Sequence, residues 1–293
     1  MRLPEEGGED KANSKRYYRF GHPGNIEMSE ELLYEKDGAV VLLTINRPDE
    51  RNLLGRIGDG ALFENAAERI QADSEVRCAV LTGAGRAFSS GGDVKAMRDR
   101  SGAFEGGSAE LRESYRSEIH RMIRALWNLD VPLIAAVNGP AIGLGNDVAC
   151  LADIRLASEK ALFGQTFLKL GLIPGDGGAW ILQQLIGYSR AAQLLLTGQL
   201  VNAETAKDWG LVSEVISPEE LLPRARELAG EIALQPPVAL RMAKQLLRAG
   251  RQNRFESVME MSANLQGILQ RTRDHDEAVA AFFEKRPPRF TGK

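Results

Sequence analysis

The sequence contains few of the residues that build covalent or metal-linked frameworks. Among its 293 residues there are two cysteines, Cys78 and Cys150, both in apolar segments, and three histidines, at positions 22, 120 and 275. A disulfide framework or a zinc site requires more thiols, or histidines at short spacing. We therefore expect two reduced cysteines in the core and no metal site.

Long apolar runs and an excess of positive charge are also missing. No segment reaches the length of a membrane span, and the sequence does not start with the charged-then-apolar pattern of a signal peptide. The formal net charge of -3 argues against a surface for nucleic acid. With 43% hydrophobic and 26% charged residues, the composition is typical of a globular protein. We expect a cytoplasmic protein with no membrane or nucleic-acid partner.

Segments of strand length alternate with segments of helical spacing in the first two thirds of the chain. Residues 39–45 and 78–82 are apolar runs typical of buried strands, and residues 61–70 between them have helical spacing. This alternation predicts an α/β fold in which helical crossovers connect the strands of a parallel sheet.

The composition changes near both ends of the chain. Residues 1–30 have little periodic apolar content, so they are predicted to form a flexible arm. From residue 218 onward the pattern is almost entirely helical. We therefore predict an α/β core at residues 31–217 and a C-terminal helical subdomain at residues 218–293.

Two adjacent glycines, Gly91 and Gly92, separate the strand at residues 78–82 from a helix predicted to begin near Asp93. Adjacent glycines allow a sharp turn and a close approach of the backbone to a ligand. The first N–H groups of a helix have no acceptor within that helix. Such a turn is therefore a candidate site for an oxyanion.

A second turn of the same kind lies in residues 132–147. An apolar strand at residues 132–137 is followed by Gly139, Gly143 and Gly145 and by another helix start. Each glycine loop alone is more commonly ordinary turn chemistry. As a pair, they predict two N–H donors, from different strand ends, that converge on one carbonyl oxygen.

At these residues the sequence resembles the enoyl-CoA hydratase/isomerase, or crotonase, superfamily. The resemblance extends over about residues 35 to 290. Its motifs are Asn46–Asn52, Phe88–Asp93, Val137–Gly145, Gly171–Gly178 and Trp209–Val212. It implies a crotonase-like spiral core of repeated ββα units, and a C-terminal subdomain that forms a homotrimer, often doubled to a hexamer.

The resemblance also implies a ligand. In that family two backbone N–H groups hold the thioester carbonyl of an acyl-CoA and stabilise the enolate formed from it; here they would be the amides of Gly92 and Leu144. Coenzyme A would be part of the substrate, with no permanently bound cofactor. The remaining implied contacts are Ser90, Gly91, Gly145 and Phe167 for the substrate, and Arg51, Asn52 and Lys285 for the coenzyme A, Lys285 from an adjacent subunit. For the last three, the alternative is a solvated loop or helix end.

Proton transfer at carbon also requires a positioned carboxylate. Hydratases of the family use two glutamates, and the resemblance aligns them with Asp147 and Phe167. Asp147 keeps the carboxylate with a reach shorter by about 1.5 Å, one C–C bond, although the helix dipole also favours an aspartate there. Burial beside Phe167 would raise its pKa, as a proton carrier at neutral pH requires. Phe167 cannot transfer a proton, so the two-glutamate route to hydration lacks one group.

Two further side chains are catalytic candidates. Asp176 lies in a Pro-Gly-Asp-Gly turn that resembles the ring-cleaving β-diketone hydrolases of the family, in which this aspartate assists catalysis. Their histidine falls at Phe167 and is missing here, and a helix N-cap is an equally good interpretation of Asp176. His120 aligns with a catalytic histidine of the family's aryl-CoA dehalogenases, but it lies one residue off an apolar helical stripe, where a polar-face residue is expected.

Three hypotheses follow. The first is an acyl-CoA enzyme of the hydratase/isomerase type, in which Asp147 or Asp176 moves a proton and double-bond migration or an atypical hydration is easier to support than standard hydration. The second is a C–C hydrolase of β-diketones or β-keto acyl-CoA. The third, motivated by Phe167, is an inactive acyl-CoA-binding homologue.

Overall fold

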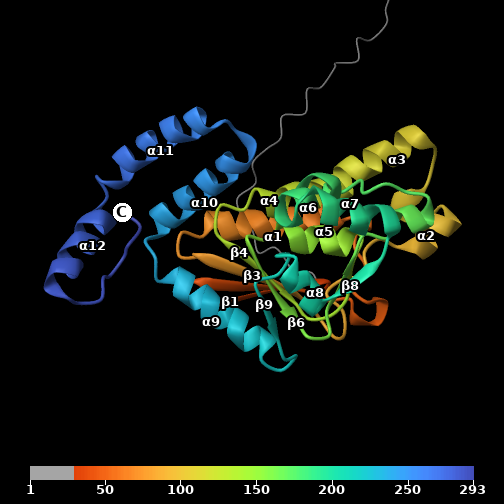
Figure 1. Cartoon of the computed structure of the whole chain (residues 1–293), viewed down its shortest axis with the longest axis horizontal. Helices are drawn as coiled ribbons and strands as arrows, with labels where there is room; N and C mark the ends of the chain where they lie inside the picture. Colours follow the sequence, from red (N-terminus) through yellow and green to blue (C-terminus); the bar gives the residue numbers. More distant parts are fainter. Residues whose placement is uncertain (1–29) are drawn as a thin grey trace, which may run out of the picture.

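A six-stranded sheet forms the centre of the molecule (Figure 1). The computed structural model describes residues 30–293, so the predicted arm at residues 1–30 lies outside the described residues except for its last position. The strand order is β1-β2-β3-β4-β6-β9; β1 pairs antiparallel with β2, and all other neighbours are parallel. The strands are β1 (Leu32–Asp37), β2 (Val40–Ile45), β3 (Cys78–Gly83), β4 (Leu133–Val137), β6 (Ile154–Ser158) and β9 (Glu214–Ile216).

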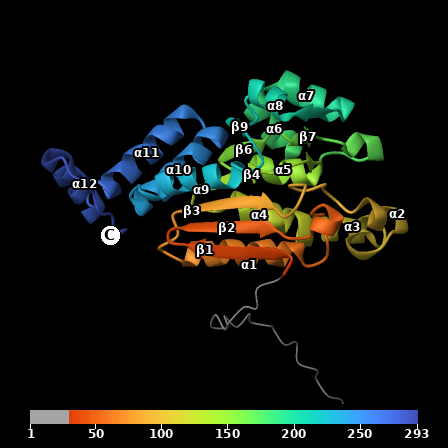
Figure 2. The same ribbon diagram turned by 90° about the horizontal axis from the view of Figure 1, so that it is seen from below.

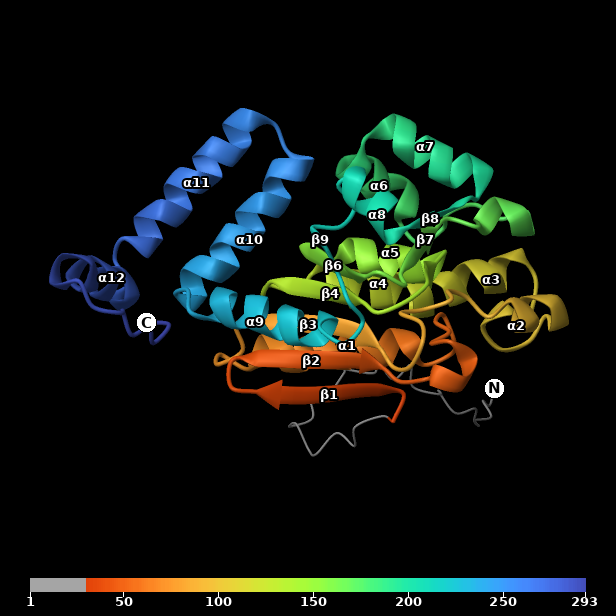
Figure 3. The same ribbon diagram turned by 60° about the horizontal axis from the view of Figure 1, so that its bottom comes forward.

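Different helices cover the two faces of this sheet, because alternate residues of a strand point to opposite faces. Val41 and Leu43 of β2 join the larger apolar core, to which α1 (Asp59–Ala72), α4 (His120–Trp127) and α5 (Leu144–Leu151) contribute. Leu42 joins a smaller core under α9 (Leu221–Ala233), which lies along the sheet (Figure 3). Burial on both faces explains why β2 and β3 are recognisable as apolar runs in the sequence.

A second, three-stranded sheet lies beside the first and completes the repeating unit. It consists of β5 (Ala141–Ile142), β7 (Leu162–Gly164) and β8 (Leu200–Asn202). A strand of the large sheet, a strand of the small sheet and a helix follow one another in β4-β5-α5 and again from β6 and β7 to α6. This repetition confirms the predicted ββα core. Three helices surround the small sheet: α6 (Gly178–Ile186), α7 (Tyr188–Thr197) and α8 (Ala203–Asp208).

Helices α2 (Val94–Asp99) and α3 (Ser108–Ser114), which follow β3 in the chain, form one end of the molecule (Figure 2). A short 3-10 helix at Gly102–Phe104 lies between them in the sequence. A π-helical turn at Tyr115–Ile119 joins α3 to α4, which packs against α1 in the body of the molecule.

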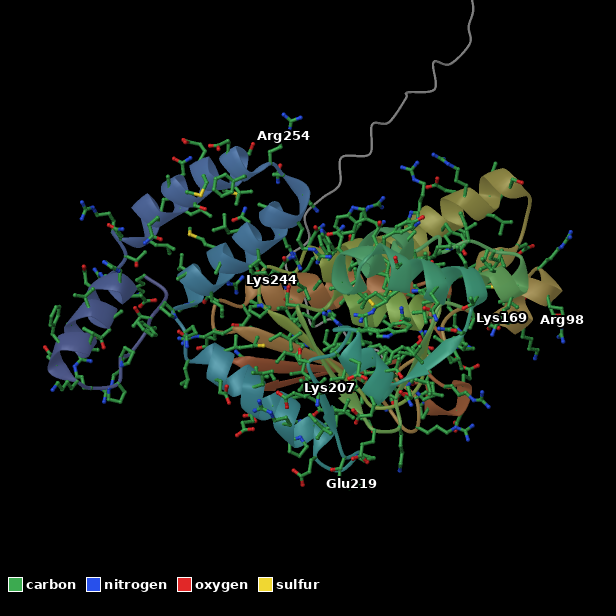
Figure 4. The ribbon with its side chains drawn as sticks, viewed as in Figure 1. Arg98, Lys169, Lys207, Glu219, Lys244 and Arg254 are labelled. Carbon is green, nitrogen blue, oxygen red and sulfur yellow. The ribbon has the colours of Figure 1, made fainter. Side chains whose placement is uncertain are left out.

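The C-terminal helices extend from the opposite end (Figures 1 and 2). They are α10 (Pro237–Gln252), α11 (Phe255–Leu269) and α12 (Arg273–Glu284). The first helix of the C-terminal subdomain predicted at residues 218–293, α9, packs on the sheet, and α10 follows it from Pro237. Lys244 fixes α10 to the core: its ammonium pairs with Asp153 at 2.7 Å and donates to the carbonyl of Val131 (Figure 4).

The extended helices carry large apolar side chains on their surface. Those exposed in the chain include Leu247, Phe255, Met259, Ile268, Phe282 and Phe283. Within residues 30–293, none of the helices combines the length and the apolarity that a membrane crossing requires.

Candidate active site

The two glycine turns predicted from the sequence lie against each other. Ser89 pairs with Ala141 in a parallel bridge, and the Ile142 amide donates to the Ser89 carbonyl at 3.0 Å. Gly91 has φ +86°, and a Cβ added to it would collide with the carbonyl oxygen of Ile142, just before the second turn. Only a residue without a side chain allows this approach, which explains the glycine at position 91.

The amides of Gly92 and Leu144 border one small cavity of about 50 Å³. Leu144 is the first residue of α5, after Gly143 at φ 55°. In the part of the chain that the structure describes, neither amide donates to another backbone group. The structure thus brings to one cavity the two residues on which the oxyanion hypothesis depends.

The remaining wall of this small cavity is mostly apolar. Its apolar side chains are Val94, Met97, Phe104, Ile119, Ile142, Phe167, Leu170 and Leu172. Its polar side chains are Ser90, Tyr115, Thr166 and Asp176. Among the described residues, Asp176 therefore supplies the one carboxyl group in this wall.

Asp176 is only 3% exposed, and its Oδ1 has no hydrogen-bond partner among the described residues. Burial raises the pKa of this carboxyl to about 7, because removal from water disfavours the charged form. The helix after it, α6, begins at Gly178 with Gly177 as its cap and has no side-chain cap hydrogen bond. Asp176 is therefore not an N-cap, and its carboxyl can both take up and release a proton near neutral pH.

Asp147 lies behind the wall rather than in it. Its Oδ1 accepts a hydrogen bond from the Gln165 side chain, and its carboxyl occupies the space next to the Cα of Gly178, at the start of α6. Burial, and then the charge of Asp176, raise the pKa of Asp147 well above its ordinary value, although hydrogen bonds from Gln165 oppose this. Asp147 is absent from the lining of the small cavity.

Phe167 covers the second glycine turn. Its Cζ would lie 3.5 Å from a Cβ at Gly143, so the ring packs on the peptide that leads to Leu144. The position that the resemblance aligns with a second glutamate is thus filled by an apolar ring in the cavity wall.

His120 supports the turn that carries Asp176. Its Nε2 lies 2.8 Å from the Gly175 carbonyl oxygen. Because a carbonyl oxygen only accepts hydrogen bonds, Nε2 carries the proton in this contact. His120 is absent from the lining of the small cavity, and it instead fixes the backbone next to Asp176.

Tyr115 is a wall residue that the sequence did not indicate. Tyr115 lies in the π-turn between α3 and α4. Because this turn shifts the helical register by one residue, a search for apolar residues at α-helical spacing does not identify Tyr115. A π-turn at a cavity is a common feature of functional sites.

A larger cavity of about 590 Å³ lies under α2 and α3. It shares Met97, Phe104 and Tyr115, among others, with the small cavity, so the two spaces adjoin. The charged side chains in its lining are Arg98 and Arg100; Arg98 points outward at this end of the molecule (Figure 4). Residues between positions 100 and 108 thus form part of this wall.

The loop that follows β2 adjoins the first glycine turn. The Ser90 amide donates to the Arg51 carbonyl at 2.9 Å, and the Leu54 amide donates to the Gly91 carbonyl at 2.9 Å. Asn52 is fully buried: its Nδ2 donates to two backbone carbonyls, and its Oδ1 accepts from the Arg47 amide. Asn52 therefore shapes the loop, whereas the side chain of Arg51 is exposed.

Two further predicted contact residues, Lys285 and Gly145, are absent from the lining of the small cavity. Lys285 caps α12 in a left-handed conformation, at the end of the molecule opposite to α2 and α3 (Figure 2). Gly145 packs against Ser89, where a Cβ would collide with the backbone. Among residues 30–293, no three histidine, cysteine or carboxylate side chains are grouped so that they could hold a metal ion.

The chain is similar to known proteins over most of its length. The model of the family described as enoyl-CoA hydratase/isomerase matches residues 35–293. The 1,2-epoxyphenylacetyl-CoA isomerase of Escherichia coli K12 is 36% identical over 91% of this chain and 100% of its own length. The crotonyl-CoA hydratase of Syntrophomonas wolfei is 35% identical over 90% of this chain and 99% of its own.

Solved structures agree with this similarity. An enoyl-CoA hydratase from Bacillus anthracis superposes with a TM-score of 0.84 and 32% identity, over 90% of this chain and 100% of that one. DspI from Pseudomonas aeruginosa superposes with a TM-score of 0.85 and 31% identity, over 92% of this chain and 100% of that one.

Proposed function

Because the chain belongs to the enoyl-CoA hydratase/isomerase family, we propose that its small cavity holds the thioester of an acyl-CoA, with the carbonyl oxygen on the amides of Gly92 and Leu144. The protein is an acyl-CoA enzyme of the hydratase/isomerase type. Two N–H groups fixed by the backbone stabilise the negative charge that develops on this oxygen when an enolate forms, and they need no rearrangement to do so.

Asp176 moves the proton. The observation that carries this assignment is that Asp176 lines the same cavity as Gly92 and Leu144, is buried, and has one carboxyl oxygen without a hydrogen-bond partner among residues 30–293. A carboxyl with a pKa of about 7 exchanges its proton readily at neutral pH. Asp147, behind the wall, is the second carboxyl of the site and acts on the reaction through its proximity to Asp176.

The apolar Phe167 favours reactions that need one proton carrier. In double-bond migration a single carboxylate removes a proton from one carbon of the enolate system and returns it to another, so the route needs no second glutamate. Phe167 then packs against the acyl group rather than taking part in proton transfer.

Exchange of the α-protons of butyryl-CoA in D2O tests the role of Asp176. The wild type should exchange them, and Asp176→Asn should reduce the rate by about 10²- to 10⁴-fold, whereas Asp208→Asn, a change at an exposed aspartate, should leave it unaltered. Exchange that persists in Asp176→Asn would remove Asp176 from the mechanism.

For coenzyme A, we assign Arg51 and Lys285 as contacts and Asn52 as the residue that shapes the loop. Lys285 is the C-cap of α12, and this helix lies at the end of the molecule opposite to α2 and α3, which supports a contact with coenzyme A on a neighbouring subunit (Figure 2). The exposed apolar side chains of α10 to α12 support a homotrimer or hexamer. We expect this assembly to act in the cytoplasm without a permanently bound cofactor.

A second candidate is a C–C hydrolase of β-diketones or β-keto acyl-CoA. The position of Asp176 in the Pro-Gly-Asp-Gly turn, with its carboxyl in the cavity wall, favours it. Incubation with a cyclic β-diketone should then yield a ring-opened acid. The third candidate, an inactive acyl-CoA binder, predicts tight thioester binding by calorimetry with neither turnover nor α-proton exchange.

A further inference from the structure

Tyr115 stands where the two cavities meet. It lines the small cavity next to Asp176 and also the larger cavity under α2 and α3. An acyl group whose thioester lies on Gly92 and Leu144 must therefore pass the tyrosine ring before it enters the larger space.

Three contacts fix the position of this ring. Its Cε1 would lie 3.2 Å from a Cβ at Gly175, directly before Asp176 in the chain. The ring meets His120 edge to face, with centroids 6.1 Å apart, and His120 in turn holds the Gly175 carbonyl. Tyr115 also packs against the large apolar core. The ring and the turn that carries Asp176 are thus held as one unit.

The phenol group has spare hydrogen-bonding capacity. Among the described residues, no hydrogen bond involves the Tyr115 hydroxyl, although the ring is half-buried. Burial and the neighbouring charge of Asp176 both raise the pKa of Tyr115, so the phenol is neutral at physiological pH. A neutral phenol both donates and accepts hydrogen bonds.

Hydration of a double bond needs such a group. The attacking water must be held by a base that takes one of its protons and by a second polar group that orients it. Asp176 can serve as the base, but Phe167 cannot orient water. Within the wall, the other polar side chains besides Asp176 are Ser90, Thr166 and Tyr115, and of these Tyr115 packs directly on the turn of Asp176.

We propose that Tyr115 is a catalytic residue that holds the attacking water at the β-carbon of an enoyl-CoA, so that this protein hydrates double bonds without a carboxylate at position 167. The proposal rests on the proposed function, because it uses the thioester site at Gly92 and Leu144 and the proton carrier Asp176.

The step balances with water as the one co-reactant. The water oxygen bonds to the β-carbon while one of its protons passes to the Asp176 carboxylate and the other O–H donates to the Tyr115 oxygen. The π electrons of the double bond move toward the thioester oxygen, which forms an enolate. Asp176 then returns its proton to the α-carbon, so H and OH have been added across the double bond.

Replacement of Tyr115 by phenylalanine tests the proposal, because it removes the hydroxyl and keeps the ring. Hydration of crotonyl-CoA and α-proton exchange of butyryl-CoA in D2O are measured on the same preparation. Tyr115→Phe should lower kcat/KM for hydration by about 100-fold while exchange, which needs only the amides and Asp176, stays within about threefold. Tyr188→Phe, at an exposed tyrosine, is the matched control and should alter neither rate.

The outcomes separate the two claims. Loss of hydration alone supports the proposal, whereas an equal loss of both activities indicates that Tyr115 only maintains the fold and overturns it. Unchanged hydration in Tyr115→Phe, or a wild type that exchanges protons but hydrates no enoyl-CoA, also overturns it and leaves the role of Asp176 intact. A wild type that performs neither reaction contradicts the proposed function itself.

Discussion

The carboxyl group of Asp147 fills the space in which Gly178 would otherwise carry a side chain. The first turn of α6 can lie this close to α5 only because position 178 has no Cβ. This contact places Asp147 behind the cavity wall and leaves Asp176, two residues before Gly178, as the carboxyl in the wall.

Substitution of Gly178 by alanine should therefore destabilise the protein. The added Cβ would overlap the Asp147 carboxyl in a tightly packed site, and overpacking of this kind costs about 1–3 kcal/mol. The control is Gly230→Ala in α9, where a Cβ meets nothing within 4 Å and helix propensity favours alanine. Urea titration should give a lower free energy of unfolding for Gly178→Ala than for the wild type, and no decrease for Gly230→Ala. Equal free energies of unfolding for the two variants would contradict this packing.

Stability should decrease as the pH rises from 5 to 8. The pKa of Asp176 is about 7 in the folded protein and near its ordinary value of 3.8 in the unfolded chain, so the folded state binds the extra proton between these values. At about 1.4 kcal/mol per pKa unit, complete ionisation would cost up to about 4 kcal/mol.

Asparagine cannot titrate, so Asp176→Asn should flatten this dependence and be more stable than the wild type at pH 8. The free energy of unfolding, measured by urea titration at each pH, tests this. Asp208→Asn should keep the slope of the wild type. A variant Asp176→Asn with an unaltered slope would show that the Asp176 carboxyl is ionised throughout this range.

The ion pair of Arg47 with Asp59 should be important for the loop next to the thioester site. Both side chains are buried, and Asp59 also accepts from the amides of Gly55 and Arg56 at 2.8 and 3.0 Å. Asp59→Ala leaves a buried guanidinium with one carboxylate fewer, which costs about 3–5 kcal/mol. We expect a lower melting temperature and a KM for acyl-CoA raised several-fold.

The exposed pair of Arg98 with Asp99 provides the comparison, because exposed ion pairs contribute at most about 1 kcal/mol. Asp99→Ala should therefore leave both the melting temperature and KM close to those of the wild type. Asp59→Ala with wild-type stability would mean that solvent replaces this ion pair without cost.

Phe167→Glu should increase hydration. A carboxylate at this position reaches the same cavity and supplies a second group for the water, so kcat/KM for crotonyl-CoA hydration should rise by about tenfold or more. In the Tyr115→Phe background, the same substitution should restore hydration. Phe167→Leu removes the ring without adding an acid and should not have this effect. A folded Phe167→Glu protein with unchanged hydration would show that position 167 does not approach the β-carbon.

Much of this architecture follows from local patterns. The buried strands β2 and β3, the two glycine turns and the helices from residue 218 onward coincide with the predicted segments, because burial on both faces, glycine pairs and helical spacing are local signals. The strand β1 was not predicted, because it lies at the sheet edge and only its first half is apolar, with three charged residues in its second half. The packing of α9 on the sheet depends on residues that are distant in the sequence, so no local pattern indicates it.

The sequence by itself determined that two glycine turns follow apolar strands, and its resemblance to the family predicted that Asp147 and Phe167 stand at the positions of two glutamates. Only the tertiary structure decided which aspartate borders the cavity. Asp147 and Asp176 are both short carboxylates near helix starts, and nothing in their local sequence distinguishes them. The missing side chain of Gly178, the hydrogen bond from Gln165 and the π-turn at Tyr115 are contacts between segments that meet only in the folded chain.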